Sequence, residues 1–242
     1  MQSEGDVRTT KLENSPHRST LSELFSPTAV VVELLGRAGR EVLTAQELQF
    51  IGHCAEKRIQ DFSAGRACAH HALAEMGIND FSLLAGTHRE PLWPTSIVGS
   101  ITHTKGFAAA VIARAEDSAG IGIDCEVVTS VTEDLWSRIC TPEDLSHLER
   151  FQEPMRSRQA ALMFAAKEAF YKCQFPMTRQ WVGFEDVSIE VLDPGAESGR
   201  FRLIPRTSLP WGVRQMDALL CRFQYRDDWV IAGVTASARV VT

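Results

Sequence analysis

The sequence predicts an α+β (α/β) fold with a pseudo-twofold duplication: two similar subdomains, each a small, mainly antiparallel sheet with helices. Apolar, β-branched runs and capped helical segments follow one another in the same order in both halves. Short turns rich in glycine and aspartate join successive strands, as antiparallel pairs require. Segments also recur: residues 43–48, 63–67 and 107–111 resemble residues 140–145, 164–168 and 229–233. Chance similarity is the alternative to duplication.

The first half is expected to run from strand to helices to strands. Thr44 and Glu47 form a capping box at the start of a helical region in two pieces, and Met76-Gly77 ends that region. Two prolines mark the next segment as a loop. The expected strand, helical region, loop and two strands cover residues 29–35, 44–73, 86–94, 97–103 and 107–113.

The second half is expected to repeat this order. It opens with a strand over residues 121–127, and Thr141 with Pro142 then starts a helix. A longer helix is predicted over residues 157–173, and Pro176 is expected to end it. Antiparallel strands are expected at residues 187–192, 201–204, 218–225 and 229–235.

The composition of the 242 residues limits the classes of protein and the compartment. No apolar run approaches the roughly 20 residues that span a bilayer, and residues 1–20 lack the apolar core of a signal peptide. We therefore expect a cytoplasmic protein with a flexible tail at residues 1–20. The two subdomains are expected at residues 21–119 and 120–242. A net charge of −6 argues against a general nucleic-acid binder. The six cysteines lack zinc-site spacing, so reduced, mostly buried thiols are expected.

The strand at residues 120–126 carries two acidic side chains on one face. Because side chains alternate along a strand, Asp124 and Glu126 share one side, and Ile123 and Cys125 share the other. Paired carboxylates with substrate phosphates are typical ligands of Mg²⁺. A solvated acidic face is the alternative.

The helix at residues 157–173 places Glu168 and Lys172 one turn apart on the same face. The helix is unusually apolar and aromatic around them, which favours partial burial. A partly buried glutamate suits a metal ligand or proton acceptor, and the lysine suits a phosphate. An exposed ion pair is the alternative.

A third group of residues could form an anion site. Arg58 and Arg66 lie about 80° apart around an ideal helix. Gly65 between them indicates close approach of a ligand or of backbone. His103 ends a strand of small hydroxyl residues. The alternatives are an ordinary basic helix face and a structural histidine.

In combination these stretches resemble the phosphopantetheinyl transferases of the surfactin/enterobactin type, closest to the enterobactin-synthetase branch. The two main motifs are Gly122-Ile123-Asp124 with Glu126, and Lys167-Glu168-Ala169-Phe170-Tyr171-Lys172. The resemblance spans about Leu43 to Asp186 and includes Phe62-x-x-Gly65-Arg66, Pro91-x-Trp93-Pro94, Gly99-Ser100-Ile101-Thr102-His103 and Trp181-x-Gly183-Phe184-Glu185-Asp186.

The resemblance implies that coenzyme A donates its 4′-phosphopantetheine arm to a serine of an acyl or peptidyl carrier protein, releasing 3′,5′-ADP. Residues 21–119 would bind coenzyme A, and residues 120–242 would carry the metal and catalytic residues. Mg²⁺, with Mn²⁺ as a substitute, would be held by Asp124, Glu126 and Glu168. Glu168 and Lys172 would be catalytic, with Glu168 as the base. Coenzyme A would be contacted by Arg58, Arg66, His88, Arg89, Ser100, Thr102, His103, Lys167 and Lys172.

The partner implied is a carrier protein of polyketide, nonribosomal peptide or siderophore synthesis, with no nucleic acid and no membrane, and the working form is expected to be a monomer. Phe175, Met177 and Arg179 are candidates for docking the carrier. His88 stands where many relatives have lysine. A Mg²⁺-dependent nucleotide pyrophosphate hydrolase and a non-catalytic binding module for coenzyme A or carrier proteins are the alternatives.

Overall fold

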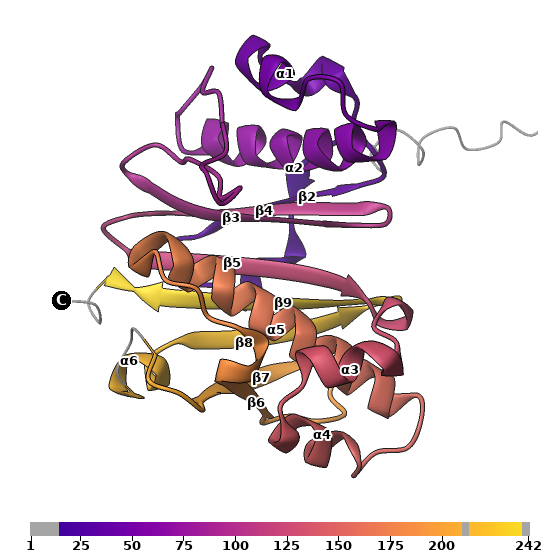
Figure 1. Cartoon of the computed structure of the whole chain (residues 1–242). Coiled ribbons are helices and arrows are strands. Elements are labelled where there is room, and N and C mark those ends of the chain that lie inside the picture. Colours follow the sequence, from indigo (N-terminus) through magenta and orange to yellow (C-terminus); the bar gives the residue numbers. More distant parts are fainter. Residues whose placement is uncertain (1–14, 210–212, 239–242) are drawn as a thin grey trace, which may run out of the picture.

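The computed structural model describes residues 15–209 and 213–238, which form two antiparallel sheets with helices on them (Figure 1). The first sheet has the order β1-β2-β4-β3, and the second has the order β5-β9-β8-β7-β6. The first comprises β1 His17–Arg18, β2 Val30–Leu35, β3 Ile97–Thr104 and β4 Phe107–Arg114. The second comprises β5 Ser118–Val127, β6 Val187–Val191, β7 Ser198–Pro205, β8 Leu220–Arg226 and β9 Trp229–Ser237. The predicted α+β class is confirmed.

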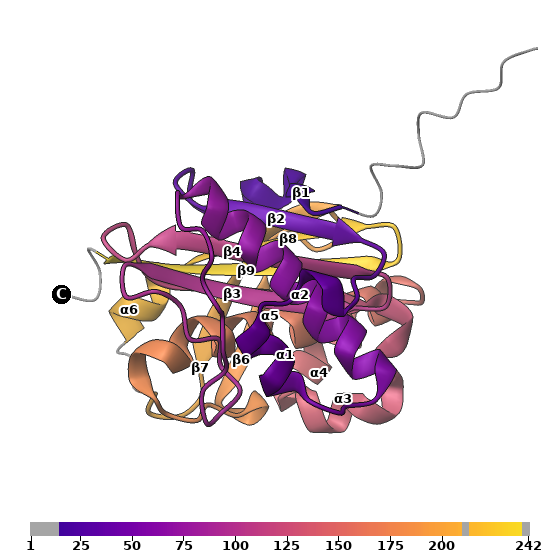
Figure 2. The same ribbon diagram turned by 90° about the horizontal axis from the view of Figure 1, so that it is seen from above.

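The helices cover the two sheets separately. In Figure 1, α2 lies above the first sheet and α5 lies in front of the second, and the view from above shows α2 crossing β2, β4 and β3 (Figure 2). The helices are α1 Ala45–Ile51, α2 Glu56–Glu75, α3 Glu133–Ile139, α4 Pro142–Leu148, α5 Met155–Thr178 and α6 Val213–Asp217. Short 3₁₀ helices are η1 Thr20–Leu24, η2 Arg40–Val42, η3 Val128–Ser130 and η4 Phe184–Asp186. No described helix is long and apolar enough to cross a membrane.

The two sheets meet along β3 and β5, where side-chain hydroxyls of β3 bind the backbone of β5. The Ile123 N–H donates to Ser100 Oγ at 3.1 Å, and the Cys125 N–H donates to Thr102 Oγ1 at 3.0 Å. The Thr102 hydroxyl also donates to Asp124 Oδ1 at 3.2 Å. We call this contact the hydroxyl seam. It joins the halves through side chains of one strand and backbone of the other.

Behind the seam lies a core to which both halves contribute. Ile123 and Cys125 of β5 pack there with Val31 and Phe107 of the first sheet and Ile231 of the second. This confirms the predicted face of Ile123 and Cys125. Separate cores lie under α2 and under α5, so each half also has a hydrophobic interior of its own.

The opposite face of β5 lies directly under α5. A Cβ atom at Gly122 would stand 1.9 Å from the carbonyl oxygen of Ala169. Only glycine therefore allows the helix to come this close to the strand. Asp124 and Glu126 follow on the same face, so this close approach sets them opposite the Glu168 and Lys172 side of the helix.

The two halves share a buried structure that we call the cap latch, formed where a short helix begins. In the first half, Glu47 completes the capping box of α1 and accepts the Leu83 N–H at 2.8 Å. The Ser82 hydroxyl donates to Thr44 Oγ1 at 2.8 Å.

The second half repeats the latch at α4. Asp144 completes the capping box, accepts the Ile189 N–H at 2.8 Å, and the hydroxyls of Thr141 and Ser188 pair at 2.8 Å. Each acid also faces a cation of the long helix, Arg66 of α2 or Lys167 of α5. Five roles recur in both halves: the threonine cap, the acid of the capping box, the backbone N–H that the acid accepts, the serine hydroxyl and the cation of the long helix. This repetition supports duplication rather than chance similarity.

Some sequence predictions need correction. Pro176 does not end the long helix, because α5 continues to Thr178 and stops at Arg179, whose φ is +55°. A proline this close to the helix end removes only one further N–H donor, because the last four carbonyls of a helix lack helical donors in any case. Residues 1–14 of the predicted tail lie outside the described residues. The tail does not extend to residue 20, because β1 pairs with β2 and Leu21 is fully buried.

The predicted boundary between the subdomains, after residue 119, falls just inside β5. The prediction for the cysteines is confirmed: Cys54 is exposed, and the other five thiols are free and buried. Three elements were not predicted from the sequence: the short helices α3 and α6 and the strand β1.

Candidate functional site

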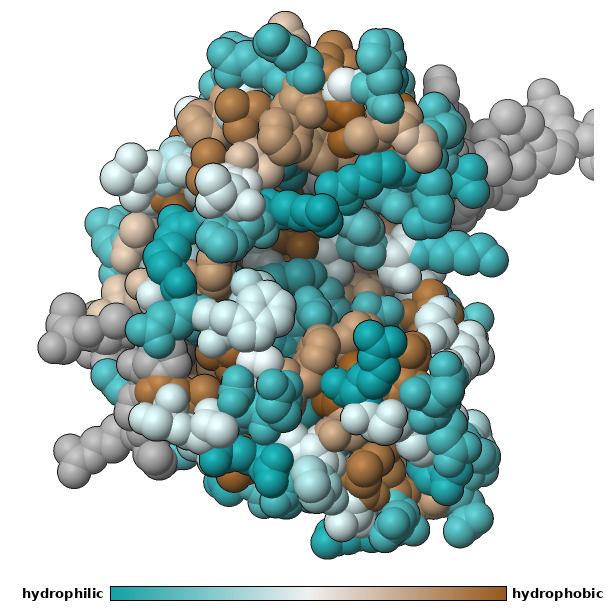
Figure 3. Space-filling model, in the orientation of Figure 1, coloured by the Kyte–Doolittle hydropathy of each residue, from teal (hydrophilic) through white to brown (hydrophobic). Residues whose placement is uncertain are grey.

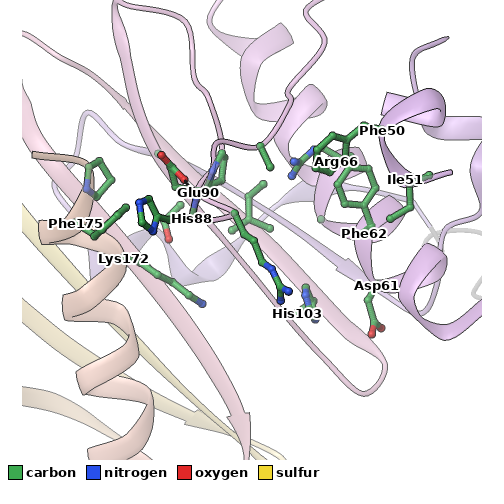
Figure 4. Close-up of a pocket in the computed structure, with 18 of the residues that line it drawn as sticks. Phe50, Ile51, Asp61, Phe62, Arg66, His88, Glu90, His103, Lys172 and Phe175 are labelled. Carbon is green, nitrogen blue, oxygen red and sulfur yellow. Dashed lines mark hydrogen bonds between the residues drawn. The ribbon is translucent and has the colours of Figure 1, made fainter. Parts of the chain in front are cut away.

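A cavity of about 580 Å³ opens between α2, the β3 end of the seam and α5. Figure 3 shows that the molecular surface at this cavity is hollowed between the two halves, and that hydrophilic residues gather around the hollow. Figure 4 shows Arg66, Phe62 and Asp61 on the α2 side and Lys172 and Phe175 on the α5 side. The cavity therefore collects side chains from both halves of the chain.

Most of the predicted ligand-binding residues line this cavity. They are Arg58, Arg66, His88, Arg89, Ser100, His103, Glu168 and Lys172. Desolvation lowers the pKa of His103, although the charge of nearby Asp61 opposes this shift. Cationic side chains from different helices, strands and loops thus face one cavity. Such a cavity can bind an anionic ligand through charge-assisted hydrogen bonds.

Arg66 enters the cavity from the buried side of α2. Its Nε donates to the Leu83 carbonyl at 2.7 Å, and its guanidinium carbon lies 4.3 Å from the centre of the Phe62 ring. Gly65 beside it allows close packing, since a Cβ there would stand 2.7 Å from Ile101 Cγ2. The predicted close approach at Gly65 is thus to a strand side chain.

Lys172 lines the other end of the cavity together with Glu168, while Asp124 and Glu126 are not among the lining residues. Lys172 Nζ donates to Asp124 Oδ1 at 2.6 Å and to the Ile123 carbonyl at 3.3 Å. Desolvation would lower the pKa of Lys172, but the charges of Asp124, Glu168 and Glu126 raise it above its ordinary value. The lysine is therefore held as an ammonium ion.

Among the described residues, Glu126 and Glu168 have no such direct partner, and both are destabilised as anions. Desolvation and the charges of Asp124 and Glu168 raise the pKa of Glu126 to about 7. Desolvation and the charge of Asp124 also raise the pKa of Glu168. A raised carboxyl pKa suits a group that accepts a proton near neutral pH.

The chemistry of this acidic set fits a divalent cation. Asp124 Oδ2 is buried without a hydrogen-bond partner among the described residues, and one lysine faces three carboxylates. Within the described ranges, however, no three His, Cys, Asp or Glu side chains are arranged to hold a metal ion. The metal site at Asp124, Glu126 and Glu168 therefore stays a prediction, supported by the donor set.

Three predicted contact residues have structural partners instead. Ser100 and Thr102 form the hydroxyl seam, and Thr102 is not among the cavity residues. Lys167 also lies outside the cavity: its ammonium group donates to Asp144 Oδ2 at 2.6 Å and to the carbonyls of Ile139 and Phe184, both at 2.8 Å. These three acceptors match its three protons, so Lys167 secures the cap latch of the second half.

An aromatic part of the wall was not predicted. Phe50 stacks on Phe62 with ring centres 5.9 Å apart, and Phe175 contacts the rings of Tyr171 and His88 at 5.2 Å. Phe62 belongs to a motif quoted above, but its exposure to the cavity depends on how α1 packs against α2. The aromatic wall provides apolar surface beside the cations.

The carrier-docking candidates differ in exposure. Phe175 is 5% exposed and lines the cavity, and Met177 packs against Gly120, so neither presents a free apolar surface. Arg179 is exposed and pairs with Glu90 at the cavity rim. Trp181, which is 77% exposed and contacts Tyr171, is the large apolar side chain most open to solvent nearby.

Comparisons with known proteins agree along most of the chain. Residues 46–113 match the 4′-phosphopantetheinyl transferase N-terminal domain, and residues 120–232 match the 4′-phosphopantetheinyl transferase superfamily. A 4′-phosphopantetheinyl transferase of Nocardia iowensis is 33% identical over 188 residues, which are 77% of this chain and 83% of that protein. One of Mycobacterium tuberculosis is 34% identical over 157 residues, 64% of this chain and 69% of that protein.

More distant similarities concern other synthases. Enterobactin synthase component D of Escherichia coli is 34% identical over 139 residues, 57% of this chain and 64% of that protein. Among solved structures, a holo-(acyl-carrier-protein) synthase of Bacillus anthracis in complex with CoA (3′,5′-ADP) has a TM-score of 0.38 and 21% identity. That match covers 50% of this chain and 97% of the other chain.

Proposed function

This chain belongs to the 4′-phosphopantetheinyl transferase superfamily, and we propose that the cavity between its halves binds coenzyme A for transfer to a carrier protein. The enzyme transfers the 4′-phosphopantetheine group of coenzyme A to a serine of an apo carrier protein and releases 3′,5′-ADP. One observation carries the assignment of the site: cations of the first half and the Glu168–Lys172 face of the second line the same cavity.

In the proposed reaction, the serine Oγ attacks the phosphorus that bears the pantetheine arm. A P–O bond to serine forms, the P–O bond to the 3′,5′-ADP leaving group breaks, and the serine gives up its proton. Glu168 accepts this proton, directly or through a water that it orients, and its raised pKa suits that role. Lys172 stabilises the pyrophosphate and the charge that develops on it.

Arg58, Arg66 and His103 bind the phosphates of coenzyme A, with His103 at the 3′-phosphate. His88 and Arg89 belong to the loop on the opposite rim, where they would contact a phosphate or the adenine. The aromatic wall of Phe50 and Phe62 gives apolar parts of the ligand a surface to pack on.

Asp124, Glu126 and Glu168 would hold Mg²⁺, or Mn²⁺ in its place. The metal would neutralise the pyrophosphate as its oxygen leaves. The buried, unpartnered Oδ2 of Asp124 and the raised pKa of Glu126 support this proposal, since a divalent cation would satisfy both groups.

The carrier proteins served are proposed to belong to polyketide, nonribosomal peptide or siderophore synthesis, and the enzyme is proposed to act as a monomer. The relatives named enterobactin synthase component D favour a siderophore pathway. The cavity is formed within one chain, which is consistent with a working monomer. The family assignment favours transfer over the two alternatives, a nucleotide pyrophosphate hydrolase and a non-catalytic binding module.

Intact-mass measurement of an apo carrier protein, incubated with enzyme, coenzyme A and Mg²⁺, tests the proposal. We expect a mass gain of one phosphopantetheine, and about 10²–10⁴-fold slower gain with Glu168→Gln, the usual effect of losing a general base. Glu185→Gln, an exposed glutamate of η4, is the matched control and should keep wild-type turnover.

Each alternative predicts a different result. Release of 3′,5′-ADP without any carrier would favour a hydrolase. Unchanged coenzyme A affinity in EDTA with no modification of carriers from several pathways would favour a binding module. Near-normal turnover of Glu168→Gln would contradict the assignment of the base.

A further inference from the structure

Glu47 of α1 is a buried carboxylate that neither lines the cavity nor has a role in the reaction described above. Its residue is 0% exposed. Oε1 lies 2.8 Å from His70 Nε2 and accepts the Leu83 N–H at 2.8 Å, and Oε2 accepts the Thr44 N–H at 2.9 Å. These contacts tie α1, α2 and the segment after α2 to a single acid.

The Leu83 peptide connects this acid to the cavity. Its N–H donates to Glu47, while its carbonyl accepts from Arg66 Nε at 2.7 Å. Glu47 Oε1 itself lies 3.8 Å from Arg66 Nε. Among the hydrogen bonds found for the described residues, Arg66 uses Nε alone. The two terminal nitrogens thus stay available to a ligand in the cavity that Arg66 lines.

The charge of Glu47 matters because Arg66 is 6% exposed. The pKa of Arg66 is lowered to about 10, because desolvation and the charge of Arg58 lower it while the charge of Glu47 opposes them. Burial would raise the pKa of Glu47, but the hydrogen bonds from His70, Thr44 and Leu83 lower it below its ordinary value. Glu47 therefore remains an anion beside the guanidinium.

The second half shows what a purely structural latch looks like. Asp144 accepts a hydrogen bond directly from Lys167 at 2.6 Å, and the lysine donates its other two hydrogen bonds to backbone carbonyls. In the first half a peptide group stands between acid and cation, so the acid fixes one edge of the guanidinium and leaves the other edge open.

We propose that Glu47 is a positioning residue, which acts through the Leu83 peptide to hold the Arg66 guanidinium aimed at a phosphate of coenzyme A. The inference rests on the proposed function, in which Arg66 contacts that phosphate. Figure 4 shows Arg66 beside Phe50 and Phe62, at the end of the cavity opposite Lys172. Glu47 would therefore affect ligand binding rather than the chemical step at Glu168.

A double-mutant cycle measured by calorimetry of coenzyme A binding, in metal-free buffer with EDTA, tests the role. We expect Glu47→Gln to weaken affinity about tenfold, the size of one lost hydrogen bond to a charged group. In an Arg66→Lys background, which lacks the guanidinium fork, the same change should have almost no further effect. In the transfer assay, Glu47→Gln should raise KM for coenzyme A and leave kcat and KM for the carrier protein unchanged.

Glu33→Gln is the matched control. Glu33 is also buried in the first half and pairs with Arg226 at 2.9 Å, but it does not line the cavity. It should lower the melting temperature and leave coenzyme A affinity unchanged. The proposal would be overturned if Glu47→Gln weakened coenzyme A affinity equally in the wild-type and Arg66→Lys backgrounds. It would also be overturned if Glu47→Gln did not weaken that affinity in the wild type.

If Glu47→Gln does not fold, His70→Asn carries the test, since His70 is partly exposed and outside the cavity. We expect about threefold weaker binding, because one restraint on Glu47 is lost; wild-type affinity would overturn the proposal. Failure of the proposed function would look different: no binding of coenzyme A by the wild type with or without Mg²⁺, or an Arg66→Lys change without effect.

Discussion

The first and second halves of the molecule build the same cap latch, but they place its cation differently. In the second half Lys167 of α5 binds Asp144 directly and is buried. In the first half Arg66 is separated from Glu47 by a peptide group and faces the cavity. One half thus uses the latch for stability alone, while the other also brings a cation to a ligand site.

The halves also differ in where glycine makes room for the long helix. In the first half Gly65 lies on the helix and faces the end of the Ile101 side chain on β3. In the second half Gly122 lies on the strand and faces the backbone of α5. The closer contact belongs to the half that carries the acidic residues. The two halves of the duplicated framework therefore differ in how closely the long helix packs on its sheet.

The largest effect is expected from breaking the sealed latch. Lys167→Met should lower the free energy of unfolding by about 3–5 kcal/mol, because it leaves Asp144 buried without its counter-charge. Arg66→Met should lower it less, since the partners of Glu47 include His70 as well. Urea unfolding of both variants measures this, and equal losses would contradict the comparison of the two latches.

The two glycines provide the next test. Gly122→Ala should cost about 3 kcal/mol or more, because the new methyl group meets a backbone carbonyl that moves only with the helix. Gly65→Ala should cost about 1 kcal/mol, because a side-chain methyl can rotate away. Thermal melts compare the pair, and a larger loss at Gly65 would show that the first half is the tighter one.

The hydroxyl seam, at which the halves meet, should respond to loss of a hydroxyl. Thr102→Val keeps the shape but removes the acceptor of the Cys125 N–H and the donor to Asp124. We expect a loss of about 1–3 kcal/mol in urea unfolding, the cost of an unsatisfied buried group. Thr102→Ser is the control and should recover most of it; equal losses would exclude the hydroxyl as the cause.

The smallest effect concerns pH and the acidic face of the second half. Because the folded pKa of Glu126 is raised to about 7, this side chain holds more of its proton in the folded protein than in the unfolded chain between about pH 4.5 and 7. The contribution of Glu126 to stability in EDTA should therefore fall as pH rises through this window and level off above it.

Melting curves of the wild type and Glu126→Gln, recorded side by side, check this effect. The variant cannot ionise, so the wild type should lose melting temperature relative to it as pH rises. Added Mg²⁺ should reduce that loss, since a cation compensates the carboxylates. A relative gain in wild-type melting temperature with rising pH would contradict the raised pKa of Glu126.

Features encoded by nearby residues could be predicted from the sequence. The capping box at Thr44, the helix start at Thr141 and the inward face of Ile123 and Cys125 follow from local spacing, and the structure confirms them. Helix α3 was missed although Thr132 is followed by two first-turn acids, because a helix of seven residues is too short to show a clear helical period.

Residue roles set by distant partners could not be predicted in this way. Lys167 sits in a motif beside Glu168, and only its contact with Asp144, far away in sequence, shows that it faces the interior. Thr102 likewise takes its role from the β5 backbone. Arg58, Arg66, His103 and Lys172 were brought together as contacts of one ligand only by the family resemblance, and they do line one cavity.

The hydroxyl seam has a consequence for recombination between related genes. At most strand borders the main chain supplies both donors and acceptors, so any sequence fits. Here Ser100 and Thr102 supply the acceptors, so compatibility is encoded by two side chains. A chimera that joins the first half of one enzyme to the second half of another should be more stable when its β3 strand keeps a hydroxyl at both positions.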